Sequence, residues 1–130
     1  MTTPLFTKTF DLTNWLLAVT NHFPRSQRFI VTKRLLDAAL DFQERLVEAN
    51  SERGKARLAR LDLADAELDK VRLYLRLAFR WQWIDEGQYG HGARLVAEVG
   101  RLLGTWKQNT AEAVGQIKRQ PAATSQVRTT

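Results

Sequence analysis

The chain has 130 residues, which fits one domain, and its apolar fraction of 44% is enough to form a core. It has no cysteine, no apolar run that approaches the roughly 20 residues of a membrane span, and no secretion signal. These absences exclude disulfide bonds and thiolate metal sites, and we expect a cytoplasmic protein that binds no membrane. The net charge of +6 favours a polyanionic partner such as nucleic acid.

Two helices are predicted in the first half of the chain, where good helix formers dominate and glycine and proline are sparse. The first covers about residues 5–21 and stops before Pro24, because proline disfavours helix in the residue before it. The second starts with Ser26 as its N-cap and runs to about Asn50. Spacings of three and four residues predict that the following side chains face the core: Leu12, Leu16, Val19 and Phe23, then Leu35 or Leu36, Ala39, Phe42 and Leu46.

The segment VRLYLRLAFRWQWI, residues 71–84, alternates apolar and other residues as a strand does. It is nevertheless too long for a typical strand, and no turn signal separates it from the helical ADAELDKV before it. We therefore predict a third helix from about Lys55 to residues 85–87, with Leu61, Ala64, Leu68, Val71, Leu75 and Ala78 facing the core. Ten of the fourteen residues in 71–84 are apolar, so a second side of this helix should be covered by another subunit.

A fourth helix is predicted over about residues 89–118, with Val96, Val99, Leu103 and Trp106 facing inward. Gly100 and Gly104 indicate close helix packing rather than a phosphate loop, because no strand precedes them and no Gly-Lys-Ser/Thr follows. Residues 119–130 should form a disordered, polar, basic tail. The four helices and their short links predict an all-α fold, an antiparallel up-down four-helix bundle over residues 1–118.

Catalytic and metal chemistry find little support in the sequence. The two histidines, His22 and His91, belong to no zinc-binding pattern, and no G-x-S-x-G motif is present. Asp62, Asp65 and Asp69 lie near one face of the third helix, but acids in the first half of a helix stabilise its dipole. We therefore predict a protein that is not an enzyme, with no catalytic residue, metal or cofactor; a small enzyme or metal-binding bundle is the less favoured hypothesis.

Arg72, Arg76 and Arg80 recur every four residues, and no carboxylate lies between residues 70 and 84. Each pair of like charges at this spacing costs roughly 0.2–0.5 kcal/mol in a helix. One interpretation is structural, in which the side chains cover apolar surface or pair with acids of other helices. The other is phosphate binding, which suits the fork of donors on each guanidinium.

Other basic and aromatic residues extend this hypothesis. Arg25 and Arg28 belong to a second basic cluster, and Arg101 lies on the fourth helix. Trp81, Trp83 and Trp106 have side chains that can stack on bases, but we favour a place in the core or at a subunit interface.

Three segments carry a resemblance to a known family: FPRSQRF (residues 23–29), LADAELDKVRLYLRLA (63–78) and VAEVGRLLGTW (96–106). They resemble the accessory variability determinant (Avd) proteins of diversity-generating retroelements, over about residues 6–107. FPRSQRF is shared with a wider group, the four-helix-bundle proteins encoded by intervening sequences of bacterial 23S rRNA genes.

The resemblance implies a function as well as a fold. Avd proteins are non-catalytic four-helix bundles that form a homopentameric barrel and bind a reverse transcriptase and its template RNA, in support of mutagenic cDNA synthesis (mutagenic retrohoming). The implied partners are thus a reverse transcriptase, template RNA or an RNA/DNA hybrid, and further copies of the chain. Arg72 and Arg76 match the family's basic pattern, Arg25, Arg28 and Arg101 match basic positions in its motifs, and Arg80 joins them only through its spacing. The alternative is a structural oligomer of the 23S intervening-sequence type with no retroelement role.

Overall fold

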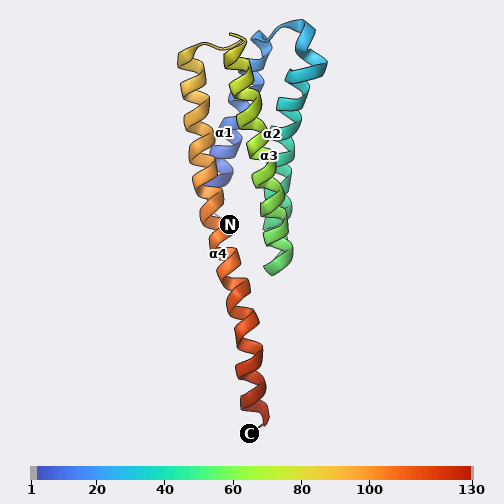
Figure 1. The fold of residues 1–130 in the computed structure, drawn as a ribbon, viewed down its shortest axis with the longest axis vertical. Helices are drawn as coiled ribbons and strands as arrows, with labels where there is room; N and C mark the ends of the chain where they lie inside the picture. Colours follow the sequence, from blue (N-terminus) through green and yellow to red (C-terminus); the bar gives the residue numbers. More distant parts are fainter. Residues whose placement is uncertain (1–2, 130) are drawn as a thin grey trace.

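The computed structural model describes the backbone of residues 3–129 and the side chains of residues 3–117. Its long helices are α1 (Thr3–Val19), α2 (Lys33–Asn50), α3 (Gly54–Arg80) and α4 (Glu86–Thr129), and no strand occurs in this part of the chain. Both α1 and α3 pack against α2 and α4, which gives an antiparallel up-down bundle (Figure 1). This is the fold that the sequence predicts for a single chain.

Each helix contributes one apolar stripe to the core. All the residues that the sequence places inward are buried, and Leu35 rather than Leu36 is the core residue at the start of α2. Full burial of a leucine or valine stabilises the fold by roughly 1.5–3 kcal/mol, so these stripes supply most of the driving force for folding.

Buried threonines extend the stripes on α1 and α4. Thr9 Oγ1 donates to the Leu5 carbonyl at 2.7 Å, and Thr110 Oγ1 donates to the Trp106 carbonyl at 2.8 Å. Each hydroxyl thereby finds a partner one turn earlier in its own helix, and its burial leaves no unsatisfied donor. Apolar periodicity does not mark threonines, so these core positions were not predictable from the sequence pattern.

The connection between α1 and α2 differs from the prediction. A 3₁₀ turn (Thr20–His22) follows α1, a second 3₁₀ turn (Arg25–Gln27) follows Pro24, and a five-residue π-helix (Arg28–Thr32) leads into α2. Ser26 lies inside the second turn and is not the N-cap of α2, so that prediction is wrong. Pro24 provides the reason, since its carbonyl accepts the Gln27 N–H at 2.9 Å and starts the turn before any α-helix begins.

The helix α3 ends at Arg80, earlier than the predicted residues 85–87. Gln82 adopts a left-handed conformation with φ 61°, and its N–H donates to the Phe79 carbonyl at 3.0 Å. The Trp83 N–H donates to the Ala78 carbonyl at 2.8 Å, which completes a Schellman motif. Glycine usually occupies this position, and because glutamine replaces it here, the sequence does not indicate that the helix ends at this point.

The helix α4 begins at Glu86, three residues before the predicted start. The Asp85 carboxylate accepts the Gln88 N–H at 2.7 Å, and the Gln88 side chain accepts the Asp85 N–H at 2.9 Å. This reciprocal pair is a capping box, which satisfies two backbone donors at the start of the helix. The spacing Asp-x-x-Gln is visible in the sequence and was interpreted there as the end of α3.

Several glycines of α4 show how closely its neighbours approach. A Cβ on Gly92 would lie 2.6 Å from the ring of Trp15, so α1 packs directly on the α4 backbone there. A Cβ on Gly100 would lie 2.5 Å from Arg72 Nη2, whereas one on Gly104 would meet no atom within 4 Å. The atom met at Gly100 is the end of the flexible Arg72 side chain, so the predicted close packing of helices is not seen at Gly100 or at Gly104 within one chain.

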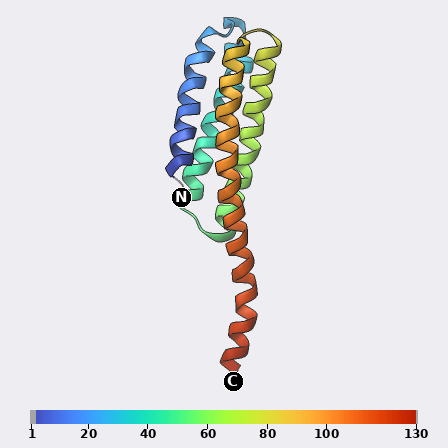
Figure 2. The same ribbon diagram turned by 90° about the vertical axis from the view of Figure 1, so that its left-hand side faces the viewer.

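The last part of α4 extends beyond the other three helices in both views (Figure 1 and Figure 2). The predicted boundary at residue 118 and the disordered tail over residues 119–130 involve side chains outside the described residues, so both stay predictions. Within residues 3–129, no helix is both long and apolar enough to cross a membrane.

We expect Gly92→Ala to lower the free energy of unfolding by roughly 1–3 kcal/mol, because the rigid Trp15 ring must move to make room for the methyl group. The matched control is Gly104→Ala in the same helix, which should raise it by about 1 kcal/mol through helix propensity. Urea unfolding followed by circular dichroism measures both values. Equal effects of the two substitutions would contradict the close approach at Gly92.

We expect Gln82→Gly to raise the free energy of unfolding by about 0.5–1 kcal/mol, because glycine adopts the left-handed conformation without steric cost. Gln108→Gly, in the middle of α4, is the control and should lower it by about 1 kcal/mol. The same urea titrations apply, and a destabilising Gln82→Gly would show that the Schellman turn is not formed in solution.

Candidate nucleic-acid interface

One end of the bundle collects basic side chains that have no acidic partner. The α1–α2 and α3–α4 connections both lie at this end, opposite the α2–α3 connection (Figure 1). The ring centroids of Phe23 and Trp83 lie 5.4 Å apart, so the two connections pack on each other. We call this region the basic end and define it by Arg25, Arg28, Arg34, Arg76 and Arg80, with the aromatic residues Phe29 and Trp81.

The charge of the basic end is not neutralised locally. Residues 20–37 and 76–90 carry six lysines and arginines against three carboxylates, whereas residues 44–65 near the other end carry five of each. All five arginines of the basic end are exposed, and none forms an ion pair with any residue in 3–117. The nearby Lys33 pairs with Asp37 at 2.5 Å. The arginines thus keep their donors available to an anion from outside the chain.

Two of the six predicted site arginines have carboxylate partners instead. Arg72 Nη1 lies 2.7 Å from Asp69 Oδ1, and Arg101 Nη2 lies 2.6 Å from Glu98 Oε1. The hydrogen bonds from Arg101 lower the pKa of Glu98 from its ordinary value. Both pairs are exposed and contribute little to stability. The structure therefore brings Arg25, Arg28, Arg76 and Arg80 to one end, and it does not bring Arg101 there.

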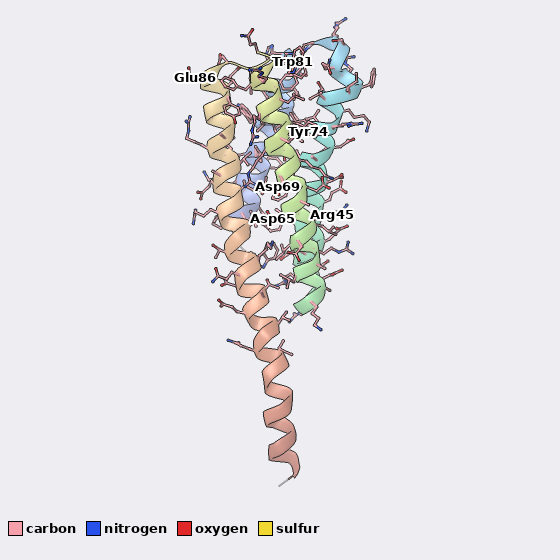
Figure 3. The ribbon with its side chains drawn as sticks, in the orientation of Figure 1. Arg45, Asp65, Asp69, Tyr74, Trp81 and Glu86 are labelled. Carbon is pink, nitrogen blue, oxygen red and sulfur yellow. The ribbon has the colours of Figure 1, made fainter. Side chains whose placement is uncertain are left out.

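The three aspartates considered for a metal are used in ion pairs. Lys107 Nζ lies 2.9 Å from Asp65 Oδ2 and 3.0 Å from Asp62 Oδ1, and hydrogen bonds to these two carboxylates raise the pKa of Lys107. Asp69, which follows Asp65 along α3 in Figure 3, is the partner of Arg72. Among the described side chains, no group of three or more His, Cys, Asp or Glu is placed to hold a metal ion.

Arg57 is an example of an arginine with a structural role. Its Nε donates to the Ala49 carbonyl at the end of α2 at 3.0 Å, and its guanidinium lies 5.5 Å from the centre of the Trp106 ring. This side chain therefore adds a charged donor to a helix-end carbonyl that also accepts the Glu52 N–H at 3.2 Å, and it adds a cation–π contact. None of the arginines of the basic end makes a side-chain hydrogen bond of this kind to another described residue.

The tryptophans separate into core and surface positions. Trp106 is 5% exposed and Trp83 packs against Phe23, which confirms the structural interpretation for these two. Trp81 is 65% exposed and follows the end of α3 (Figure 3), so a core position is wrong for Trp81 and a place at a subunit interface stays a prediction. Phe29, which the sequence analysis did not single out, is 81% exposed on the π-helix.

Two hollows flank the packed Phe23–Trp83 pair. One lies between α1, the α1–α2 connection and α2, and its walls include Arg25 and Arg28. The other lies beside the α3–α4 connection, and its walls include Arg76 and Arg80. Cationic groups therefore border recessed surface on both sides of the basic end, where a phosphate chain can be held by several donors together.

Part of the apolar surface of α3 is uncovered in the single chain. Leu63 is 49% exposed, Leu73 is 55% exposed, and Phe79 is 38% exposed. The core accepts only one stripe of this helix, as its six buried residues show. These three side chains do not share one side of the helix, so the second apolar side and its covering by another subunit both stay predictions.

The fold and the surface together define the class of protein, which is a four-helix bundle with a basic end that no carboxylate neutralises. The family model described as bAvd-like matches residues 5–110, and the chain therefore belongs to the bAvd-like family. Similar in fold is a protein with unknown function from the S23 ribosomal protein family of Bacteroides thetaiotaomicron, with a TM-score of 0.72 and 18% identity over 79% of this chain and 97% of that chain. No curated protein matches this chain.

We expect Arg57→Ala to lower the free energy of unfolding by about 1–2 kcal/mol, because the Ala49 carbonyl loses a charged donor and Trp106 loses its cation. Arg76→Ala is the control, and it should change the value by less than about 0.5 kcal/mol, since arginine and alanine are both good helix formers. Thermal and urea unfolding measure the difference. A comparable loss in both variants would show that Arg76 also has a structural role.

Proposed function

We propose that this protein is a non-catalytic accessory subunit of a diversity-generating retroelement, which binds template RNA and the reverse transcriptase through its basic end. The match of the bAvd-like family model to residues 5–110 carries the proposal, because the description of that family likens it to Avd. The unpaired arginines of the basic end support it independently, since they are the groups that such a partner requires.

The proposed binding is electrostatic in origin. Arg76 and Arg80 are one helical turn apart on α3, and each can form two hydrogen bonds to a phosphate. Each phosphate contact on single-stranded RNA releases counterions and contributes about −0.7 to the slope of log K against log salt. Acidic surface on the reverse transcriptase would be attracted by the same field, so one basic end serves both partners in the complex.

An oligomer follows from the uncovered apolar surface. Leu63 and Leu73 lie on the outer side of α3, and exposed apolar side chains of this size are stabilised when another subunit covers them. We propose the pentameric ring of the Avd resemblance, in which five chains at +6 would carry about +30 in total. Such a charge would concentrate RNA near the ring. We place this role in the cytoplasm, where transcripts and the polymerase are made.

The fold similarity to the S23-family protein favours a second candidate, a structural oligomer without a retroelement role. The two candidates differ in what they bind, since only the first needs a reverse transcriptase. Co-purification with the reverse transcriptase of the same retroelement therefore separates them.

We expect Arg76→Gln/Arg80→Gln to weaken binding of single-stranded RNA about tenfold at low salt and to flatten the salt slope by about 1.4. Fluorescence anisotropy of a labelled RNA at low and near-physiological salt measures both quantities. The matched control is Arg53→Gln/Lys55→Gln, which removes the same charge from exposed residues at the start of α3, at the opposite end. Analytical ultracentrifugation first establishes that all three proteins form the same oligomer.

Equal losses in the two double variants would indicate a general charge effect and would argue against the basic end as the site. A wild-type protein that binds neither RNA nor the cognate reverse transcriptase at low salt would overturn the proposed function. If RNA binding is unchanged in Arg76→Gln/Arg80→Gln while capture of the reverse transcriptase is lost, these arginines serve the polymerase and the RNA site lies elsewhere.

A further inference from the structure

The α1–α2 connection has an unusual backbone and an unusual surface. Residues 28–32 form a π-helix, a conformation that is rare and is concentrated at functional sites. None of its five residues is buried, and Phe29 and Ile30 are 81% and 53% exposed. A ring this exposed adds little to the stability of the single chain, and its faces are open to a ligand.

Beside Phe29 lies a hollow of about 630 Å³, within the range of small-molecule sites. Leu17, Leu36 and Leu40 make its wall apolar on one side. Asn21 and Thr32 contribute polar groups, and the Thr32 hydroxyl is the one buried side-chain oxygen or nitrogen in residues 3–117 without a hydrogen-bond partner. The Asn21 side chain is exposed and can bond to a ligand, whereas the Thr32 oxygen is covered by the protein.

The charges around the hollow favour an anion. Arg25 and Arg28 line it, both are exposed, and neither pairs with a carboxylate among the described residues. Asp37 also lines it, but its carboxylate is paired with Lys33. The rim therefore presents two free guanidinium groups and no free carboxylate.

This hollow has the groups that bind a nucleotide. It combines an exposed aromatic ring, an apolar wall with a few polar groups, and guanidinium groups. A base stacks on an aromatic ring, its edge bonds to amide and hydroxyl groups, and its phosphates bind arginine. A base paired in a duplex is already stacked on both faces, so only an unpaired base has a face to offer Phe29.

We propose that the α1–α2 connection is a subsite for an unpaired nucleotide of RNA, in which Phe29 stacks on the base and Arg25 and Arg28 hold the adjacent phosphates. The subsite rests on the proposed function, because it assumes that the protein binds RNA. It goes further by naming the form of RNA and by assigning a role to an aromatic residue rather than to charge.

The test compares Phe29→Leu with wild type on a short oligouridine and on an RNA duplex of the same length. Loss of one stacked base should weaken binding to oligouridine by roughly 5- to 100-fold without changing the salt slope, because no charge is removed. Binding to the duplex should not change, and Phe29→Trp should retain binding to oligouridine. The matched control is Phe10→Leu, which removes another exposed phenylalanine (59% exposed) from α1 and should leave both affinities unchanged.

A second readout reports the stacking itself. The fluorescence of 2-aminopurine placed in the oligouridine should be quenched by wild type and by Phe29→Trp, and not by Phe29→Leu. Arg25→Gln/Arg28→Gln should instead flatten the salt slope by about 1.4.

The outcomes separate this proposal from the one on which it rests. If wild type binds oligouridine and Phe29→Leu binds it equally well, the subsite is wrong while RNA binding by the basic end stands. If wild type binds no RNA at all, both fail. If Phe29→Leu keeps its RNA affinity but changes the oligomeric state or loses the reverse transcriptase, the ring of Phe29 belongs to a protein interface and the subsite is overturned.

Discussion

A four-helix bundle of this size has one core, and each helix can present only one stripe of side chains to it. This limit governs the second half of α3 most strongly, because residues 71–80 are largely apolar while only Val71, Leu75 and Ala78 among them are buried. The leucines that the core does not accept, among them Leu63 and Leu73, remain at the surface together with Arg72, Arg76 and Arg80. The same geometric limit therefore creates both the surface that another subunit would cover and the arginine row.

The arginines then divide according to the carboxylates within reach. Arg72 has Asp69 three residues earlier, and Arg101 has Glu98 three residues earlier, so both form pairs within their own helices. Arg76 and Arg80 have no acid at that spacing, because the residues three positions before them are Leu73 and Leu77. The apolar character that leaves α3 uncovered also leaves its last arginines unpaired, and this places the free charge at the end of the helix.

The packing of the helices against one another was predictable, because it depends on the regular spacing of apolar residues along each helix. Every predicted core residue of α3 is buried, since apolar residues spaced three and four positions apart can be recognised in the sequence alone. The helix ends were harder, because they depend on single residues in uncommon roles. Gln82 takes a left-handed conformation that sequence rules assign to glycine, and the π-helix shifts the start of α2 without any marker residue. Of the candidate site, the arginine positions were predictable, but their partners were not, and Phe29 had no signal beyond its place between two helices.

The two connections that escaped prediction carry Phe29 and Trp81, and the free arginines lie in them or next to them. The left-handed backbone conformation of Gln82 and the π-helix of residues 28–32 both cost free energy relative to a regular helix with a glycine cap. The Schellman motif and the capping box at Asp85 hold the α3–α4 connection, and Phe23 against Trp83 holds it to the other connection, so the surrounding packing offsets that cost. Such packing fixes Arg76 and Arg80 on one side of the end and Arg25 and Arg28 on the other. A polyanion that contacts both sides would still have to order the exposed guanidinium groups, but the backbone that carries them need not rearrange on binding.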